Sequence, residues 1–297
     1  MAQALTAWVR DDVTVSEVER VLPRLREEAT EPGQAPDLRT SVMTHLAWVT
    51  PDWLEAARST LAGMAERHPS RTLLLVPHPD DTADRIDASA YLQTFQPPQL
   101  DRCVSTEVVE LHLRGATASA PASVVQPLLI SDLPVFLRWR GLPPWGAPEL
   151  EQLVGVADRL VVDSIEWPDV PADYAGLLDV FPQVAASDIA WARTGRWRVL
   201  LASLWPGIAE VETIRVRGTV AQANLLAGWL RSRLGKAITL EHDPAERLEG
   251  IDLDGRPAPF PPGNPPTASE LLSDELETYA RDPVYEAAVA AAISPSP

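Results

Sequence analysis

The sequence predicts an α/β fold, with two α/β domains that have mixed or mostly parallel sheets, followed by a C-terminal helical tail. The chain has 297 residues, which is enough for two domains of ordinary size. Short apolar or alternating segments, typical of strands, are separated by segments with helical periodicity. Residues 134–139, 148–157 and 159–163 show strand, helix and strand patterns, the succession that a parallel βαβ unit requires.

The N-terminal domain is expected to span residues 1–165. Its strands are the short apolar or alternating runs, and residues 104–113 alternate with a period of two. The predicted strands are residues 40–49, 71–76, 88–95, 104–113, 134–139 and 159–163. Its helices have an apolar face or, as with Pro121, a proline suited to a first helical turn. The predicted helices are residues 51–68, 118–130 and 148–157.

The second domain is expected to span residues 166–254 and to begin with a loop rich in proline. Gly235 follows an apolar helical run, where it is suited to a C-terminal cap. The predicted helices are residues 196–205 and 221–234, and the predicted strands are residues 212–217, 237–241 and 251–254.

Residues 255–297 are expected to form a proline-rich linker and a helical tail. The linker, residues 255–266, cannot hold a regular hydrogen-bonded element because proline lacks an N–H group. Two short helices are predicted behind it, at residues 268–281 and 284–292. Helices this short are not stable alone, so they must pack on this chain or on a partner. We expect the tail to be a separable docking element.

The composition excludes several classes of function. A formal net charge of −17 repels phosphate backbones, so we expect no nucleic-acid partner. No apolar run approaches the roughly 18 residues of a membrane span, and early charges in the first residues are unlike a signal peptide. We therefore expect a cytoplasmic protein. The single cysteine, Cys103, excludes an internal disulfide framework and a cysteine-based zinc cluster.

Two segments combine tryptophan and arginine, the residue types that dominate protein interfaces when they are not in the core. One ends a predicted strand, and the other runs from Ser187 to Trp205. Positive charge gathered on an acidic chain favours a partner that bears carboxylates. Each indole is either a side chain of the core or an anchor in an interface, and the local sequence pattern does not decide between these two possibilities. The candidate partner-binding residues are Trp139, Arg140, Trp191, Arg193, Arg196, Trp197 and Arg198.

The same segments resemble the glucose-6-phosphate dehydrogenase assembly protein family, OpcA. The residues that carry the resemblance are ASVV at 122–125, DLPVFL at 132–137, DRLVVDS at 158–164, DIAWAR at 188–193 and GRWRVLL at 195–201. The resemblance implies a non-catalytic protein that binds glucose-6-phosphate dehydrogenase and favours its active oligomer or conformation. Such a protein acts as an allosteric activator and raises NADPH production by the oxidative pentose phosphate pathway.

One enzymatic alternative starts from PHPDD at Pro77 to Asp81, directly after an apolar strand. Zinc-dependent N-acetylsugar deacetylases of the LmbE type have a similar segment, in which the histidine and one aspartate hold the metal. Here Thr82 replaces the glutamate that should follow, and the distal metal histidine is missing. The sequence also lacks a Gly-x-Ser-x-Gly elbow, a Gly-x-Gly-x-x-Gly turn and a Walker loop. We therefore expect no catalytic residues, no metal and no cofactor.

A second alternative is a module that senses a sugar phosphate or a nucleotide. Arg138, Arg140 and Arg159 gather at the ends of neighbouring predicted strands, where open parallel sheets often bind ligands. His45 alternates with apolar residues, and we expect it to be a hydrogen-bonded histidine of the core or of a sheet face.

Overall fold

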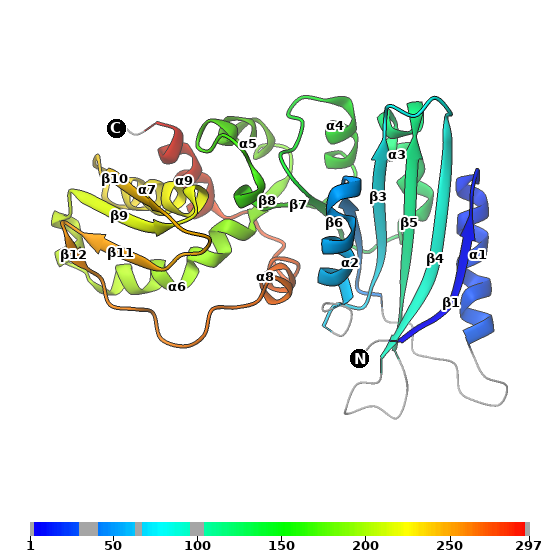
Figure 1. Cartoon of the computed structure of the whole chain (residues 1–297), viewed down its shortest axis with the longest axis horizontal. Coiled ribbons are helices and arrows are strands. Elements are labelled where there is room, and N and C mark those ends of the chain that lie inside the picture. Colours follow the sequence, from blue (N-terminus) through cyan, green and yellow to red (C-terminus); the bar gives the residue numbers. More distant parts are fainter. Residues whose placement is uncertain (1–2, 30–40, 63–66, 96–103, 295–297) are drawn as a thin grey trace. The chain divides into compact units, whose positions relative to one another are not determined.

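The computed structural model describes residues 3–29, 41–62, 67–95 and 104–294, which form two compact units, 1–160 and 161–297 (Figure 1). Both units contain parallel and antiparallel strands together with helices, so the predicted α/β class is confirmed. The domain boundary after residue 165 stays a prediction. None of the helices in the described part of the chain is long and apolar enough to cross a membrane.

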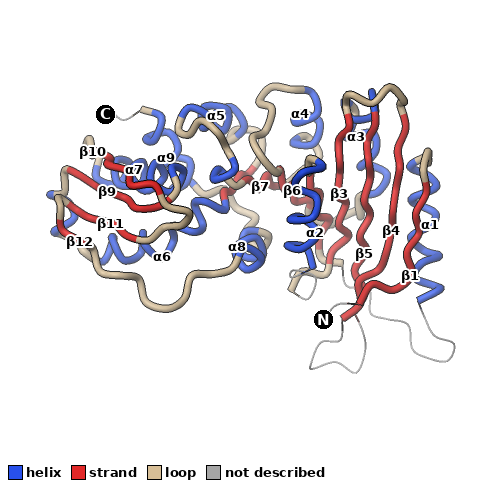
Figure 2. Tube along the Cα trace, viewed as in Figure 1, coloured by secondary structure: helices blue, strands red, loops and turns tan. Residues whose placement is uncertain are grey.

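The first unit is built on a mixed sheet in which the strand order is β1-β4-β5-β3-β2-β6 (Figure 2). Four neighbouring strands, β5, β3, β2 and β6, pair in parallel, and β1 and β4 pair antiparallel at the edge. The strands are β1 (Gln3–Arg10), β2 (Met43–Trp48), β3 (Ser70–His78), β4 (Arg85–Phe95), β5 (Val104–Arg114) and β6 (Val135–Trp139). In β3, four consecutive residues, 73–76, are fully buried, as expected for a parallel strand covered on both faces.

Helices cover both faces of this sheet. On one face, Glu107 of β5 pairs with Arg26 of α1 (Val15–Ala29). On the other face, Glu110 of the same strand pairs with Arg58 of α2 (Leu54–Ala62). Side chains three residues apart on a strand point to opposite faces, so α1 and α2 lie on different sides of the sheet. The two other α-helices described in this unit, α3 (Pro121–Val125) and α4 (Pro148–Val154), contact each other.

Two predicted helices of the first unit differ from the structure. Residues 118–130 form the short helix α3 between two 3-10 helices, η2 (Gly115–Ser119) and η3 (Gln126–Leu128). Pro127 explains the break, because it lacks an N–H group and its ring clashes with the preceding turn. Residues 51–68 form η1 (Pro51–Trp53) and α2, and the chain is no longer helical at residue 67; positions 63–66 lie outside the described residues. Position 40 of the first predicted strand and Cys103 also lie outside them.

The second unit contains a four-stranded sheet with strand order β10-β9-β11-β12. β9 (Thr213–Gly218) and β10 (Thr239–Pro244) are parallel and are joined by α7 (Val220–Leu234). β11 (Gly250–Leu253) is antiparallel to β9, and β12 (Arg256–Pro257) forms the edge. Thr219 and Gln222 form a capping box at the start of α7, and Gly235 ends it with a φ of 60°, as its sequence position predicts.

A second group of elements in this unit leads into its longest surface helix. β7 (Arg159–Val162) begins at the end of the first unit, and β8 (Ala185–Asp188) runs directly into α6 (Ile189–Ser203). Between them lie η4 (Ser164–Glu166), η5 (Ala172–Tyr174) and α5 (Ala175–Val180). α6 begins seven residues before the predicted start at Arg196, because the Asp188 side chain accepts a hydrogen bond from the Ala190 N–H group and caps the helix.

The C-terminal residues are integrated into the second unit. α8 (Ala268–Glu275) contacts α6, and α9 (Pro283–Ile293) packs along α7. Tyr285 of α9 is fully buried, and Gly228 of α7 meets the backbone of Ala288 so closely that no side chain fits between them. This packing changes our expectation for the tail. α9 is a part of the core of the second unit, so we no longer expect it to be separable.

Candidate partner surface and adjoining pocket

The three tryptophans among the candidate site residues are buried in the described chain. Trp139, Trp191 and Trp197 are 2%, 4% and 6% exposed. Trp139 ends β6 and stacks on Trp48 with ring centroids 4.9 Å apart. The guanidinium of Arg140, the next residue, lies 4.4 Å from the ring centroid of Trp53. Of the two readings that the sequence left open, the structure favours the core for these indoles.

Trp191 attaches α6 to the start of α9. Its indole Nε1 donates a hydrogen bond to Asp282, the residue that caps α9, at 2.9 Å. The guanidinium of Arg198 lies 3.4 Å from the centroid of the Trp191 ring, close enough for a cation–π contact. Burial lowers the pKa of Arg198 to about 10, while the carboxylate of Asp282 opposes that shift. Both side chains therefore have a role inside the second unit.

Arg193 belongs to a buried polar network where β7 and β8 end. Its guanidinium donates to both carboxylate oxygens of Asp163, at 2.9 and 2.8 Å. Next to Asp163, the Ser164 hydroxyl donates to the buried Asp188 carboxyl at 2.6 Å. Burial raises the pKa of Asp188 to about 7, and the nearby charge of Asp163 adds to that shift.

Arg196 and Trp197 hold the proline-rich segment, residues 257–266, against α6. The Arg196 guanidinium donates to the carbonyl oxygens of Pro261 at 2.9 Å and Gly263 at 2.5 Å, and also to that of Pro262. The Trp197 ring meets the ring of Phe260 edge-on, with centroids 5.7 Å apart. The proline-rich linker predicted at residues 255–266 has almost no regular structure, as expected, and Arg196 of α6 holds it at three carbonyl groups.

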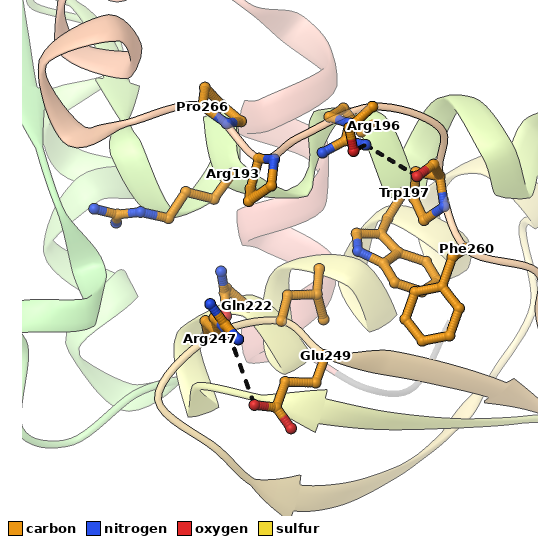
Figure 3. A pocket seen from close by; sticks show the side chains of 12 residues that line it. Arg193, Arg196, Trp197, Gln222, Arg247, Glu249, Phe260 and Pro266 are labelled. Atoms are coloured by element: carbon orange, nitrogen blue, oxygen red, sulfur yellow. Dashed lines mark hydrogen bonds and ion pairs between the residues drawn. The ribbon is translucent and has the colours of Figure 1, made fainter.

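A pocket of about 580 Å³ lies between this proline-rich segment, α6 and the loop that joins β10 to β11 (Figure 3). Trp197 and Phe260 lie side by side at one end, and Arg247 and Glu249 lie together in the loop. Arg193 also lines it, although its guanidinium points away from the two aromatic rings. This pocket was not predicted from the sequence, because its walls come from four separate segments, at residues 193–197, 222, 247–249 and 260–266, which only the fold brings together.

Exposed apolar side chains lie on the outer face of α6 and just beyond its end, and they were not among the predicted site residues. Val199 is 74% exposed and Trp205, just beyond the helix, is 67% exposed. Ala202 is exposed between them. Val199 and Ala202 are three residues apart and therefore neighbours on the helix surface, and Trp205 follows directly after the helix end. The signal was present in the sequence, since a helix that starts at Ile189 turns Trp197 and Leu201 inward and Val199 outward.

The segment Pro77 to Asp81, considered above as a zinc site, forms ion pairs and hydrogen bonds with neighbouring side chains. His78 Nε2 lies 2.8 Å from His112 Nδ1, and His112 Nε2 lies 2.8 Å from Glu110. Asp81 accepts a hydrogen bond from Arg114 at 2.8 Å, which lowers the pKa of the Asp81 carboxyl. Burial lowers the pKa of His78, and the charges of His112 and Arg114 add to this effect. The described residues contain no group of three or more histidine, cysteine or acidic side chains suited to a metal ion.

The arginines of the proposed sensing site are not presented together at a surface. Arg138 and Arg159 are buried in the described chain, whereas Arg140 is partly exposed. His45 is also buried, and neither of its ring nitrogens has a hydrogen-bond partner among the described residues, which differs from our expectation. Burial lowers the pKa of His45 to about 4, and the nearby Arg138 and His68 add to the shift.

Comparison with known proteins places these features in a family. Residues 62–178 match the glucose-6-phosphate dehydrogenase subunit N-terminal domain, and residues 184–259 match the C-terminal domain of the same subunit. The chain is 26% identical over 182 residues to a protein of Nostoc punctiforme named OxPP cycle protein OpcA. This alignment covers 58% of this chain and 39% of the relative. It is 27% identical over 183 residues to the protein of that name in Synechococcus elongatus, and this alignment covers 58% of this chain and 41% of the relative.

The chain thus spans about two fifths of the length of these curated relatives. With both domains of the subunit matched in order along its sequence, the chain belongs to the OpcA family of glucose-6-phosphate dehydrogenase assembly proteins.

Proposed function

We propose that the protein is a non-catalytic assembly factor and allosteric activator of a glucose-6-phosphate dehydrogenase, and that it supports NADPH production by the oxidative pentose phosphate pathway. The observation that carries this proposal is the match of both subunit domains, over residues 62–178 and 184–259. The sequence supplies no nucleophile elbow and no dinucleotide-binding turn, so the chemistry belongs to the partner. We expect the protein to act in the cytoplasm, where this pathway operates.

We further propose that the outer face of α6 contacts the dehydrogenase. This surface consists of Val199, Ala202 and Trp205, with Arg196 at its border. An exposed tryptophan surrounded by smaller apolar groups is typical of the centre of an interface. Trp191 and Trp197 are buried beneath the helix, and we assign them the role of holding α6 in position. Trp139 is buried as well, and Arg140, which is partly exposed, stays a prediction for a contact made by the first unit.

Binding to the purified dehydrogenase tests this surface. Trp205→Ala is expected to weaken the complex by about 30-fold, the equivalent of about 2 kcal/mol at an interface hot spot. Val199→Glu is expected to weaken it as well, because it places a charge in the apolar stripe. The measurement is titration calorimetry of the full chain against the dehydrogenase, with circular dichroism to verify that each variant is folded.

A matched control is Val220→Glu. Val220 is an exposed valine at the first residue of α7, where a carboxylate interacts favourably with the helix dipole. It is expected to bind like the parent chain. If Trp205→Ala and Val199→Glu bind as tightly as Val220→Glu, the α6 surface is the wrong one. If the parent chain does not bind the dehydrogenase at all, the proposed function itself is wrong.

A further inference from the structure

The pocket beside α6 has an apolar end formed by aromatic and proline rings. Phe260 is 74% exposed, and its ring is inclined by 60° to the ring of Trp197, so most of the Phe260 ring is open to a ligand. Pro261, Pro265 and Pro266 line the same cavity. Flat, rigid apolar walls of this kind are suited to a planar aromatic ring, because stacking on them costs little side-chain entropy.

The charged groups of the pocket leave one guanidinium for an anion. Arg193 is occupied by Asp163, and Arg196 by the carbonyl groups of the proline-rich segment. Arg247 is exposed and lies 3.9 Å from Glu249, which is longer than a charge-assisted hydrogen bond. A guanidinium in this position can bind one phosphate group in a bidentate manner. With Arg193 neutralised by Asp163, the pocket lining still has two arginines, Arg196 and Arg247, against the single glutamate Glu249, which favours an anion at Arg247.

Glu249 and the size of the cavity restrict the ligand further. The Glu249 carboxylate faces the same loop and can accept hydrogen bonds only, so it is suited to sugar hydroxyl groups beside the phosphate. A volume of about 580 Å³ lies within the range of small-molecule sites and exceeds what a bare phosphate fills. An aromatic ring, hydroxyl groups and one phosphate are the three parts of a nucleotide.

We propose that this pocket binds a nucleoside monophosphate, with the base against Phe260 and the phosphate at Arg247. Recognition of this kind does not use a glycine-rich turn, which the sequence lacks. The ligand contacts the proline-rich segment and α6 together, so its binding fixes the segment more firmly against the helix. The proposal goes beyond the assembly function and does not depend on it.

Titration calorimetry of the full chain tests the proposal with four probes: adenosine 5′-monophosphate, adenosine, inorganic phosphate and glucose 6-phosphate. The monophosphate is expected to bind at least about tenfold more tightly than each of the other three, because only it offers both the ring and the phosphate. Arg247→Ala is expected to weaken binding of the monophosphate by about tenfold and to leave adenosine unchanged. Phe260→Ala is expected to weaken both by about fivefold or more.

Two variants outside the pocket serve as controls. Arg256→Ala removes an exposed arginine of β12, and Trp205→Ala removes an exposed aromatic side chain of the partner surface. Both are expected to bind the monophosphate like the parent chain. No binding of the monophosphate at millimolar concentration overturns the proposal, as does an Arg247→Ala variant that binds like Arg256→Ala. Equal affinity for glucose 6-phosphate also overturns it, because the aromatic ring then contributes nothing.

Discussion

At the scale of single residues, the buried carboxyl group of Asp188 connects three elements of the second unit. It accepts hydrogen bonds from the Ser164 hydroxyl at 2.6 Å and the Ala190 N–H group at 2.8 Å, and the Tyr285 hydroxyl of α9 lies 3.4 Å away. Burial raises the pKa of this group to about 7, despite the hydrogen bonds that favour the charged form. The carboxyl group therefore takes up a proton near neutral pH, while it remains packed.

This shift predicts how stability changes with pH. In the unfolded chain the Asp188 carboxyl titrates near pH 4, and in the folded chain near pH 7. Between these values the folded state holds a proton that the unfolded state has lost. The contribution of Asp188 to the free energy of unfolding is therefore fully present below about pH 4 and is lost as the pH rises through 7. The total loss is on the order of a few kcal/mol.

Asp188→Asn isolates that contribution, because asparagine keeps the shape and does not titrate. Its oxygen still accepts from the Ser164 and Ala190 N–H groups, and its amide NH2 group donates to the Ser164 hydroxyl, which then acts as acceptor. The parent chain is expected to lose stability relative to Asp188→Asn between pH 5 and pH 8. Chemical denaturation at four pH values in this range gives the difference in the free energy of unfolding. A difference that stays constant with pH would show that Asp188 titrates normally. His45, whose pKa is lowered, acts in the opposite direction in both proteins and cancels in the comparison.

The sequence singled out the tryptophan and arginine residues of α6 but gave no indication of the groups that they contact. Tryptophan and arginine at 191–198 were recognised as interface-forming types, but their partners are distant in the sequence. Trp191 bonds Asp282, 91 residues away, and Arg196 bonds carbonyl groups 65 to 67 residues away. Local periodicity contains no information on such contacts. Local periodicity does indicate that Val199 is exposed, once the helix is known to begin at Ile189.

At the scale of elements, the close approach of α7 and α9 holds the C-terminal helix in the second unit. A Cβ atom at Gly228 would lie 2.1 Å from the backbone oxygen of Ala288 and 3.0 Å from the backbone nitrogen of Ala292. Neither atom belongs to a flexible side chain, so the helices must separate to accommodate it. Gly228 is therefore required by packing, although glycine is unfavourable inside a helix.

Gly228→Ala is expected to destabilise the protein by about 1 to 3 kcal/mol, as overpacking of a tight helix contact does, despite the gain of roughly 1 kcal/mol in helix propensity. Gly195→Ala in α6 is the matched control. The nearest atom there is a side-chain nitrogen of Arg198 at 3.7 Å, so this change is expected to stabilise the protein slightly. The measurement is the midpoint of urea unfolding. Equal midpoints for the two variants would mean that α9 does not pack on α7 in solution.

The elements that the sequence predicted well are those with a strong local signal. The parallel strands β2, β3 and β6 and the helix α7 have apolar runs or a capping residue at their ends, and their positions were predicted closely. No element was predicted for residues 3–29, where the structure has β1 and α1. α1 contains Pro23 and many charges, which obscure its helical pattern. Short elements such as β8 and α5 depend on tertiary packing and are not visible in local periodicity.

At the scale of the whole molecule, the net charge of −17 limits how the protein meets a partner. Long-range repulsion disfavours acidic partners except where positive groups are exposed at the contact. Most arginines of the α6 region are occupied by internal acceptors, so the surface at Val199 and Trp205 is mainly apolar. We therefore expect association to depend only weakly on salt, in contrast to an interface that rests on exposed arginines facing carboxylates.

The allosteric part of the proposed function makes a prediction about the complex as a whole. If binding of this chain shifts the dehydrogenase toward a state that binds substrate more tightly, substrate must tighten the complex by the same factor. Couplings of this kind are typically about 1 to 3 kcal/mol, or about five- to 150-fold in affinity. We expect the dissociation constant of glucose 6-phosphate to fall by such a factor when the chain is bound. The dissociation constant of the chain should fall equally when glucose 6-phosphate is bound.

Both constants are measured by equilibrium binding, since reciprocity holds for affinities and not for catalytic rates. Trp205→Ala supplies a further check. The Trp205→Ala variant is expected to need a higher concentration to saturate the dehydrogenase. At saturation it should lower the dissociation constant of glucose 6-phosphate as much as the parent chain does, because Trp205 contributes to the affinity for the dehydrogenase and not to the coupling. Unequal factors for the two ligands would exclude an equilibrium coupling between the sites. If both factors equal one while the complex still forms, this chain assembles with the dehydrogenase without activating it through substrate affinity.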